Sequence, residues 1–172
     1  METQKTLAFT GLRPHKLPWG FKEDHPACLA LKTAIHGRLI QLIKEENVRH
    51  MISGMAMGID MICAEIVLDL KARYPDITLE AAIPCRDQDL LWPQKARDRY
   101  HCILSRCDSV HIVSEAYTDD CMMKRNQYMV HKSDFILAVW DGKPGGTGNT
   151  VKYAQKRHKQ IIVMDPSIGA CP

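Results

Sequence analysis

Short apolar segments of strand length alternate with segments of helical periodicity along almost the whole chain. The strand-like segments are rich in branched residues and span residues 7–9, 48–52, 77–83, 110–113, 135–140 and 161–164. The clearest helical pattern places Ile59, Ile62, Cys63, Ile66, Val67 and Leu70 at offsets of three and four. Strands that alternate with helices pair in parallel through right-handed crossovers. The sequence therefore predicts a doubly wound α/β fold with a mostly parallel sheet and helices on both faces.

Four further helices are expected, near residues 24–47, 92–104, 121–131 and 150–157. The first should begin at Asp24, which is a capping residue type, with Pro26 just inside the helix. A chain of 172 residues is the size of one domain, and we expect a single domain over residues 1–172.

Composition narrows the possible environments. The apolar runs are all shorter than a membrane span, and the first residues lack a signal-peptide pattern. We therefore expect a cytoplasmic protein without a membrane partner. The net charge of +3 is below what a dedicated nucleic-acid binder usually carries.

The cysteines and histidines do not predict a metal centre. There are seven cysteines, an odd number, without a Cys-x-x-Cys pair, which fits reduced thiols. The local cluster of soft ligands is His101, Cys102, Cys107 and His111. It is divided between an expected helix and an expected strand, so we expect no metal requirement.

Two glycine-rich turns join a strand to a helix, where backbone N–H groups and the helix dipole favour phosphate. The later turn follows the strand-like residues 135–140, and its candidate ligand-binding residues are Asp141, Gly145, Gly146, Thr147, Gly148, Asn149 and Thr150. The earlier turn offers Ser53, Gly54, Met57, Gly58 and Asp60. Asp60 could accept a ribose hydroxyl, although capping of its own helix is the more common role of such a residue. Ligands of doubly wound folds bind at the carboxyl ends of the strands, where both turns belong.

Further polar residues belong to the same edge. Thr10, Gly11 and Arg13 close the first strand, and an arginine there suits a phosphate or carboxylate, or is an ordinary surface residue. Arg125 and Asn126 lie on the helix expected after the fourth strand. Convergence of several elements on one edge is the main signal of a binding site.

Known catalytic motifs do not match. The spacing of Gly54 and Gly58 is not the dinucleotide Gly-x-Gly-x-x-Gly pattern, and the chain has no Walker A sequence and no Gly-x-Ser-x-Gly elbow. An NAD dehydrogenase, a P-loop ATPase and a serine hydrolase are therefore disfavoured.

Taken in order, these segments resemble the SLOG superfamily, which joins the Smf/DprA proteins to the Lonely-guy nucleotide hydrolases. The segment Ser53-Gly54-Met55-Ala56-Met57-Gly58-Ile59-Asp60 looks like the Smf/DprA motif Ser-Gly-x-Ala-x-Gly-Ile-Asp. Ser114-Glu115 and Lys124-Arg125-Asn126 are similar to later elements of that family. The opening residues 10–14 and the segment 141–150 look most like the YpsA-like branch. The resemblance implies a Rossmann-like fold and a pocket for a nucleotide or nucleotide-derived ligand, and possible homo-oligomers.

Departures from the hydrolase pattern shift the expectation from cleavage to binding. Lonely-guy hydrolases have a catalytic glutamate after the glycine-rich loop, whereas here the loop continues with Asn149 and the glutamate position holds Lys152. We expect binding or sensing of a nucleoside phosphate, ADP-ribose or NAD-type ligand. The alternative is a nucleoside-monophosphate N-glycosidase (phosphoribohydrolase) that uses Asp60 or Glu115. Binding of single-stranded DNA ranks third, because aromatic residues are only 6% and are not interleaved with a basic run.

Overall fold

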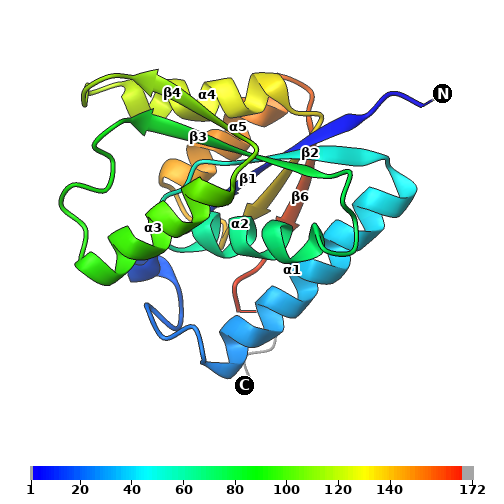
Figure 1. Cartoon of the computed structure of the whole chain (residues 1–172), viewed down its shortest axis with the longest axis horizontal. Coiled ribbons are helices and arrows are strands. Elements are labelled where there is room, and N and C mark those ends of the chain that lie inside the picture. Colours follow the sequence, from blue (N-terminus) through cyan, green and yellow to red (C-terminus); the bar gives the residue numbers. More distant parts are fainter. Residues whose placement is uncertain (1, 168–172) are drawn as a thin grey trace.

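The computed structural model describes residues 2–167, which form a six-stranded parallel sheet and five α-helices (Figure 1). In chain order the elements are β1 (Lys5–Gly11), the 3-10 turn η1 (Pro14–Lys16), α1 (Pro26–Glu45), β2 (Val48–Ser53), α2 (Ile59–Leu70), β3 (Thr78–Cys85), α3 (Gln94–Arg106), β4 (Ser109–Ser114), α4 (Cys121–Lys132), β5 (Phe135–Val139), α5 (Gly146–Lys156) and β6 (Gln160–Met164). Of the helices in this range, none combines the length and the apolar character that crossing a membrane requires.

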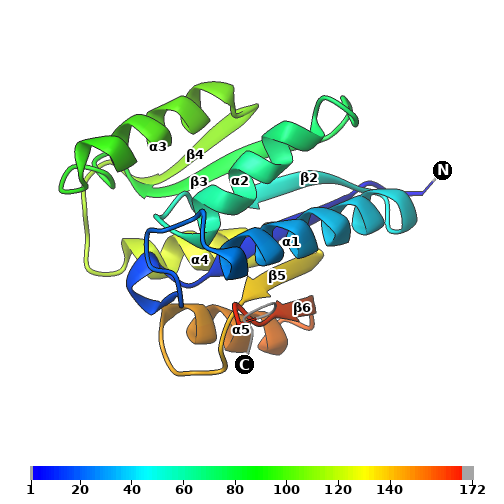
Figure 2. The same cartoon turned by 90° about the horizontal axis from the view of Figure 1, so that it is seen from below.

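The sheet has the strand order β4-β3-β2-β1-β5-β6, and every neighbouring pair is parallel. Helices α1, α2 and α3 cover one face, and α4 and α5 cover the other (Figures 1 and 2). The predicted doubly wound, Rossmann-like α/β fold is therefore confirmed. The chain runs outward from β1 to β4 and then returns to place β5 on the other side of β1.

Alternation along the strands divides the core into two layers. In β1, Leu7 and Phe9 point into the larger core under α1–α3, whereas Ala8 points into the smaller core under α4 and α5. The residues of β5 are buried on both faces, which explains its continuous apolar sequence.

Three helix starts differ from the sequence prediction. His25, not Asp24, caps α1, because its Nδ1 accepts a hydrogen bond of 3.1 Å from the N–H of Ala27. Helix α3 begins at Gln94, since Trp92 precedes Pro93 and is thereby disfavoured in helical conformation. Helix α5 begins at Gly146, four residues before the predicted start, so the glycine-rich segment forms the first turn of the helix.

The strand order creates a switch point between β1 and β5. Their last residues, Gly11 and Val139, are partners in the sheet. The chain leaves these two strands in different directions, toward α1 on one face and α5 on the other. Such a divergence leaves a crevice at the carboxyl ends of the strands, where ligands of this fold class bind.

Candidate functional site

A cavity of about 620 Å³ opens at this switch point. Its walls come from the end of β1 and the η1 turn, the start of α2, the inner side of α4, and the segment that joins β5 to α5. It is lined by Phe9, Thr10, Gly11, Leu12, Arg13, His15, Lys16, Ala56, Asp60, Met122, Arg125, Asn126, Met129, Trp140, Asp141, Lys143, Pro144, Gly145, Gly146, Thr147 and Gly148. We call it the switch-point cavity.

The N-terminus of α5 forms one end of this cavity. The N-cap residue Gly145 has no side chain to bond the helix, and the bond of 2.9 Å from the N–H of Asn149 to the Gly145 carbonyl begins the helical pattern. The N–H groups of residues 146–148 precede that bond and have no carbonyl within the helix to pair with. A Cβ placed on Gly145 would lie 2.7 Å from Nζ of Lys16. An ammonium group and free backbone donors therefore meet at one point.

A buried pair of opposite charges forms the other end. Arg125 is 4% exposed and donates from Nη1 to the carbonyls of Gly54 and Ala82, and from Nε to Oδ1 of Asn126 at 2.8 Å. Asp60 is 8% exposed, and its Oδ2 accepts from the N–H of Ala56 at 3.2 Å. Burial raises the pKa of Asp60, against the opposing effects of Arg125 and the Ala56 N–H.

Gly54 is needed for this arrangement. A Cβ at this position would lie 2.6 Å from Nη1 of Arg125 and 2.9 Å from Oδ2 of Asp60. Both charged groups therefore occupy the space that a side chain at residue 54 would fill. Gly54, after the end of β2, therefore leaves room for both charges, and Ser53 and Gly54 are not among the residues that line the cavity.

Two other predicted glycines serve packing between β1 and α2. A Cβ on Gly11 would lie 2.4 Å from Cγ2 of Ile59. Gly58 has a φ of 96°, and a Cβ there would lie 2.7 Å from the carbonyl oxygen of Leu12, which accepts the N–H of Ile59 at 3.3 Å. These glycines let the strand end and the helix start touch.

The structure places most, but not all, of the predicted residues at the cavity. Those that line it are Thr10, Gly11, Arg13, Asp60, Arg125, Asn126, Asp141, Gly145, Gly146, Thr147 and Gly148. Ser53 lies behind it, fully buried, and donates to the Asp60 carbonyl at 2.8 Å. Thr150 bonds the Gly146 carbonyl within α5, and Asn149 is exposed outside the lining. Met57 and Gly58 line a different cavity.

Several lining residues have no counterpart in the sequence prediction. The basic side chains are His15, Lys16 and Lys143, and the apolar side chains are Phe9, Leu12, Met122, Met129 and Trp140. Lys16 lies on a turn without a recognisable motif, and it approaches Gly145 only because β1 and β5 are neighbours. Trp140 could have been found, because it directly follows β5 at the edge where the site was expected.

Asp60 and Asp141 are the carboxylates among the described residues that line the cavity. Oδ1 of Asp141 accepts the N–H of Lys143 at 3.1 Å, so this side chain closes a local turn. Glu115 lies outside the lining and pairs with Arg86, at the end of β4. The arrangement can hold an anion and hydrogen-bond a polar ligand, and it leaves Asp60 as the carboxylate placed for acid or base chemistry.

Comparison with known proteins gives relatives over nearly the whole chain. The YpsA family model, described as the YspA SLOG family, matches residues 7–166. A UPF0398 protein from Bacillus cereus is 35% identical over 156 residues, and one from Bacillus thuringiensis is 34% identical over 156 residues. Each alignment covers 89% of this chain and 84% of the relative.

Two solved structures share the fold. DNA processing protein A from Streptococcus pneumoniae gives a TM-score of 0.62 at 16% identity, over 93% of this chain and 50% of that chain. The present chain thus spans half the length of the pneumococcal protein. DNA processing protein A from Helicobacter pylori gives a TM-score of 0.60 at 20% identity, over 96% of this chain and 71% of that chain.

At these identities the two structures establish the fold alone. Membership of a family rests on the match to its model over residues 7–166 and on relatives that are 35% identical over most of their length. The chain belongs to the YpsA family of SLOG proteins.

Proposed function

We propose that this protein binds a nucleotide or a nucleotide-derived ligand, such as a nucleoside phosphate, ADP-ribose or NAD, in the switch-point cavity. The observation that carries the proposal is the position of the Lys16 ammonium group beside Gly145, where α5 begins with free N–H groups. Helix N-termini with a neighbouring cation are sites that favour phosphate.

The charges around this point support a phosphate rather than a cation. Arg13, His15 and Lys16 come from the segment after β1 and line the same cavity as the α5 N-terminus. The first turn of α5 has no acidic residue. A phosphate group placed here would therefore meet backbone donors on one side and side-chain cations on the other.

The rest of the cavity suits a nucleoside. Phe9, Met122, Met129 and Trp140 supply apolar surface for a base. Because Oδ1 of Asn126 accepts from Arg125, the amide of Asn126 is oriented with its NH₂ group free to donate to a ligand. Asp60 provides a carboxylate that could accept a hydroxyl hydrogen bond. The ligand would then extend from α5 across β1 toward α2.

Isothermal titration calorimetry with AMP, ADP, ADP-ribose, NAD and inorganic phosphate tests the proposal. At least one nucleotide should bind with a dissociation constant in the micromolar range and raise the melting temperature, because preferential binding stabilises the folded state. If no ligand of the panel gives a heat of binding and none changes the melting temperature, the nucleotide-binding proposal is refuted.

Binding of single-stranded DNA is the second candidate, and one observation favours it. The two solved structures described above are DNA processing proteins, and the one from Helicobacter pylori was determined for its single-stranded DNA binding mode. Arg13, His15, Lys16 and Lys143 at the cavity could contact backbone phosphates. Fluorescence anisotropy of a labelled oligonucleotide should then rise on binding and fall steeply with salt. An unchanged anisotropy at low salt would remove this candidate.

Hydrolysis of a nucleoside monophosphate at its N-glycosidic bond is the third candidate. It is favoured by the burial and raised pKa of Asp60, since a carboxyl group with a raised pKa can act as an acid. Chromatography of AMP incubated with the protein should then show free adenine, and Asp60→Asn should abolish its release. Intact AMP after prolonged incubation would exclude this reaction for that substrate.

A further inference from the structure

A second cavity, of about 630 Å³, lies behind a wall that it shares with the switch-point cavity. Pro14 lines the second cavity, whereas its neighbours Arg13 and His15 line the first. The start of α2 divides in the same way, because Met57 and Gly58 belong to the second cavity and Asp60 to the first. The two spaces are therefore separate sites with one common wall.

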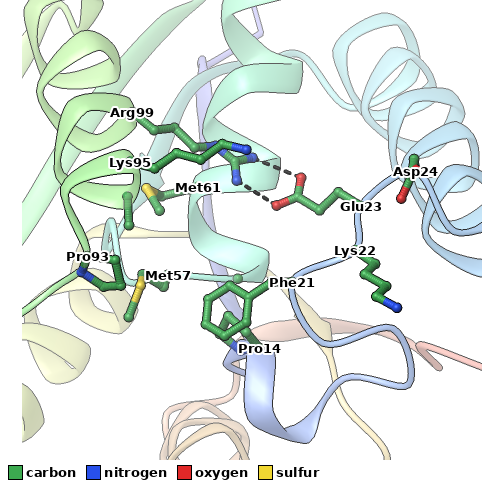
Figure 3. A pocket seen from close by; sticks show the side chains of 12 residues that line it. Pro14, Phe21, Lys22, Glu23, Asp24, Met57, Met61, Pro93, Lys95 and Arg99 are labelled. Atoms are coloured by element: carbon green, nitrogen blue, oxygen red, sulfur yellow. Dashed lines mark hydrogen bonds and ion pairs between the residues drawn. The ribbon is translucent and has the colours of Figure 1, made fainter.

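The second cavity lies between the loop after η1, the start of α2 and the start of α3 (Figure 3). It is lined by Pro14, Phe21, Lys22, Glu23, Asp24, Met57, Gly58, Met61, Pro93, Lys95, Ala96 and Arg99. We call it the α2–α3 cavity. Nothing in the proposed nucleotide site uses these residues.

One end of the α2–α3 cavity is apolar. Met57, Pro93 and the ring of Phe21 gather there in Figure 3, and Met61 and Ala96 also line the space. Phe21 is 69% exposed, although it is a large apolar side chain at the rim of a concavity. A ligand that covered this ring would remove apolar surface from water, which favours binding.

The other end of the cavity is polar, and its charged side chains neutralise one another. Arg99 donates to Glu23 at 3.0 Å and to Glu65 at 2.8 Å, and Lys32 pairs with Glu23 at 3.1 Å. Burial would raise the pKa of Glu23, but the bonds from Arg99 and Lys32 outweigh it and lower this pKa. Two cations and two carboxylates thus form a fixed network at the back of the cavity.

Lys95 adds a charge that this network does not neutralise. It lines the cavity from the first turn of α3, on the same helix as Arg99 (Figure 3). Within residues 2–167 it has no ion-pair partner within 4.0 Å. The opposite charges of Lys22 and Asp24 lie at the outer edge, away from Met57 and Pro93. Within the described residues Lys22 likewise has no ion-pair partner within 4.0 Å. The cavity therefore combines an apolar floor with an available ammonium group on α3 and a second one at its outer edge.

We infer that the α2–α3 cavity is a second small-molecule site, which takes a compact aromatic or branched aliphatic molecule carrying one anionic group. Its volume lies within the range of about 300–1,000 Å³ typical of such sites. The apolar part would lie against Met57, Met61 and Phe21, and the anion would pair with Lys95. This inference is independent of what occupies the switch-point cavity.

NMR signals of methionine methyl groups allow ligand binding at the two cavities to be measured separately. Met57 and Met61 line the α2–α3 cavity, whereas Met122 and Met129 line the switch-point cavity. In protein labelled with ¹³C at the methionine methyl groups, single Met→Leu variants assign the four signals. Titration with 3-phenylpropanoate should shift the signals of Met57 and Met61 and leave those of Met122 and Met129 in place.

Variants test the two halves of the site. Lys95→Ala should weaken 3-phenylpropanoate binding about tenfold through loss of a charge-assisted contact, as should replacement of the ligand by neutral 3-phenylpropanamide. Ala96→Trp should fill the cavity and abolish the shifts. Phe21→Ala, at a side chain that is 69% exposed, should leave the melting temperature nearly unchanged and weaken binding about fivefold. Lys152→Ala, on α5 and outside both cavities, is the matched control and should bind normally.

Three outcomes would overturn the inference. The first is that Met57 and Met61 do not respond to 3-phenylpropanoate, 3-methylbutanoate or phenethyl phosphate at millimolar concentration. The second is that these probes shift Met122 and Met129 instead. The third is equal binding of the acid and its amide by both wild type and Lys95→Ala, which would remove the anion-binding role. A failure of nucleotides to bind would leave these signals unchanged, so the two proposals fail separately.

Discussion

The ammonium group of Lys16 lies 2.7 Å from the point where a side chain on Gly145 would begin. The two residues are far apart in sequence and meet because β1 and β5 are neighbours in the sheet. Lys16 follows β1 through the η1 turn, and Gly145 precedes α5. The contact joins the two sides of the switch point at the place where we expect phosphate to bind.

Lys16→Ala should weaken nucleotide binding about tenfold, because it removes one charge-assisted contact to phosphate. Lys16 is exposed, so the melting temperature of the free protein should hardly change. Calorimetric titration of wild type and variant measures the effect. Lys152→Ala is the control, and equal affinities for wild type and Lys16→Ala would show that Lys16 does not contact the ligand.

Gly146→Asp should separate binding from stability. A Cβ at residue 146 meets no atom within 4 Å, and residue 146 is exposed, so a side chain there has no clash at its base. A carboxylate in the first turn interacts favourably with the helix dipole and stabilises the folded protein by about 0.3–1 kcal/mol. The melting temperature should therefore stay the same or rise slightly. The same charge would repel a phosphate, and affinity should fall at least about 100-fold. Unaltered nucleotide affinity in this variant would place the phosphate elsewhere.

Gly54→Ala should destabilise the protein. Its Cβ would lie 2.6 Å from Nη1 of Arg125 and 2.9 Å from Oδ2 of Asp60, and overpacking costs about 1–3 kcal/mol. Gly37→Ala is the matched control, because Gly37 is exposed on α1 with open space around it. That variant should gain about 0.5–1 kcal/mol from helix propensity. Urea unfolding measures both, and the account fails here if Gly54→Ala is as stable as wild type.

Glu80→Gln should lower stability in a pH-dependent manner. Glu80 accepts hydrogen bonds from Tyr128 and, at 2.7 Å, from His50, which outweigh burial and lower the pKa of Glu80 below its ordinary 4.5. A lowered pKa in the folded state gives stability that is present above pH 4.5 and lost as the pH falls through the folded-state value. The variant should therefore lose about 1–3 kcal/mol near pH 7, and the difference should shrink below pH 4.5. A difference that is constant from pH 7 to pH 3 would contradict this assignment.

The strands could be predicted well because a strand that is buried on both faces has a recognisable local sequence. Segments such as 135–140 are continuous runs of branched apolar residues, as expected for parallel strands covered on both faces. The start of α5 could not be predicted, because glycine disfavours helices. Gly148 is nevertheless helical, and a Cβ there would lie 3.1 Å from the ring of Trp140, so its close contact with the residue after β5 requires a glycine inside the helix.

The sequence could predict which edge of the sheet holds the candidate site, but not the full set of residues that meet there. Asp60 and Gly145 from the two turns, and Arg125 from α4, line one cavity at the expected edge of the sheet. The sequence did not show that Gly11, which lines the cavity, also serves packing, because its close neighbour is Ile59, a residue of another element. Lys16 could not be found either, since its role follows from strand order.

The most direct test of the nucleotide proposal is a titration of ¹³C-methyl-methionine protein with AMP, ADP, ADP-ribose and NAD. The account predicts that at least one ligand shifts the signals of Met122 and Met129, which line the switch-point cavity, and that Lys16→Ala moves the midpoint to about tenfold higher concentration. Unchanged Met122 and Met129 signals with every nucleotide at millimolar concentration would contradict it.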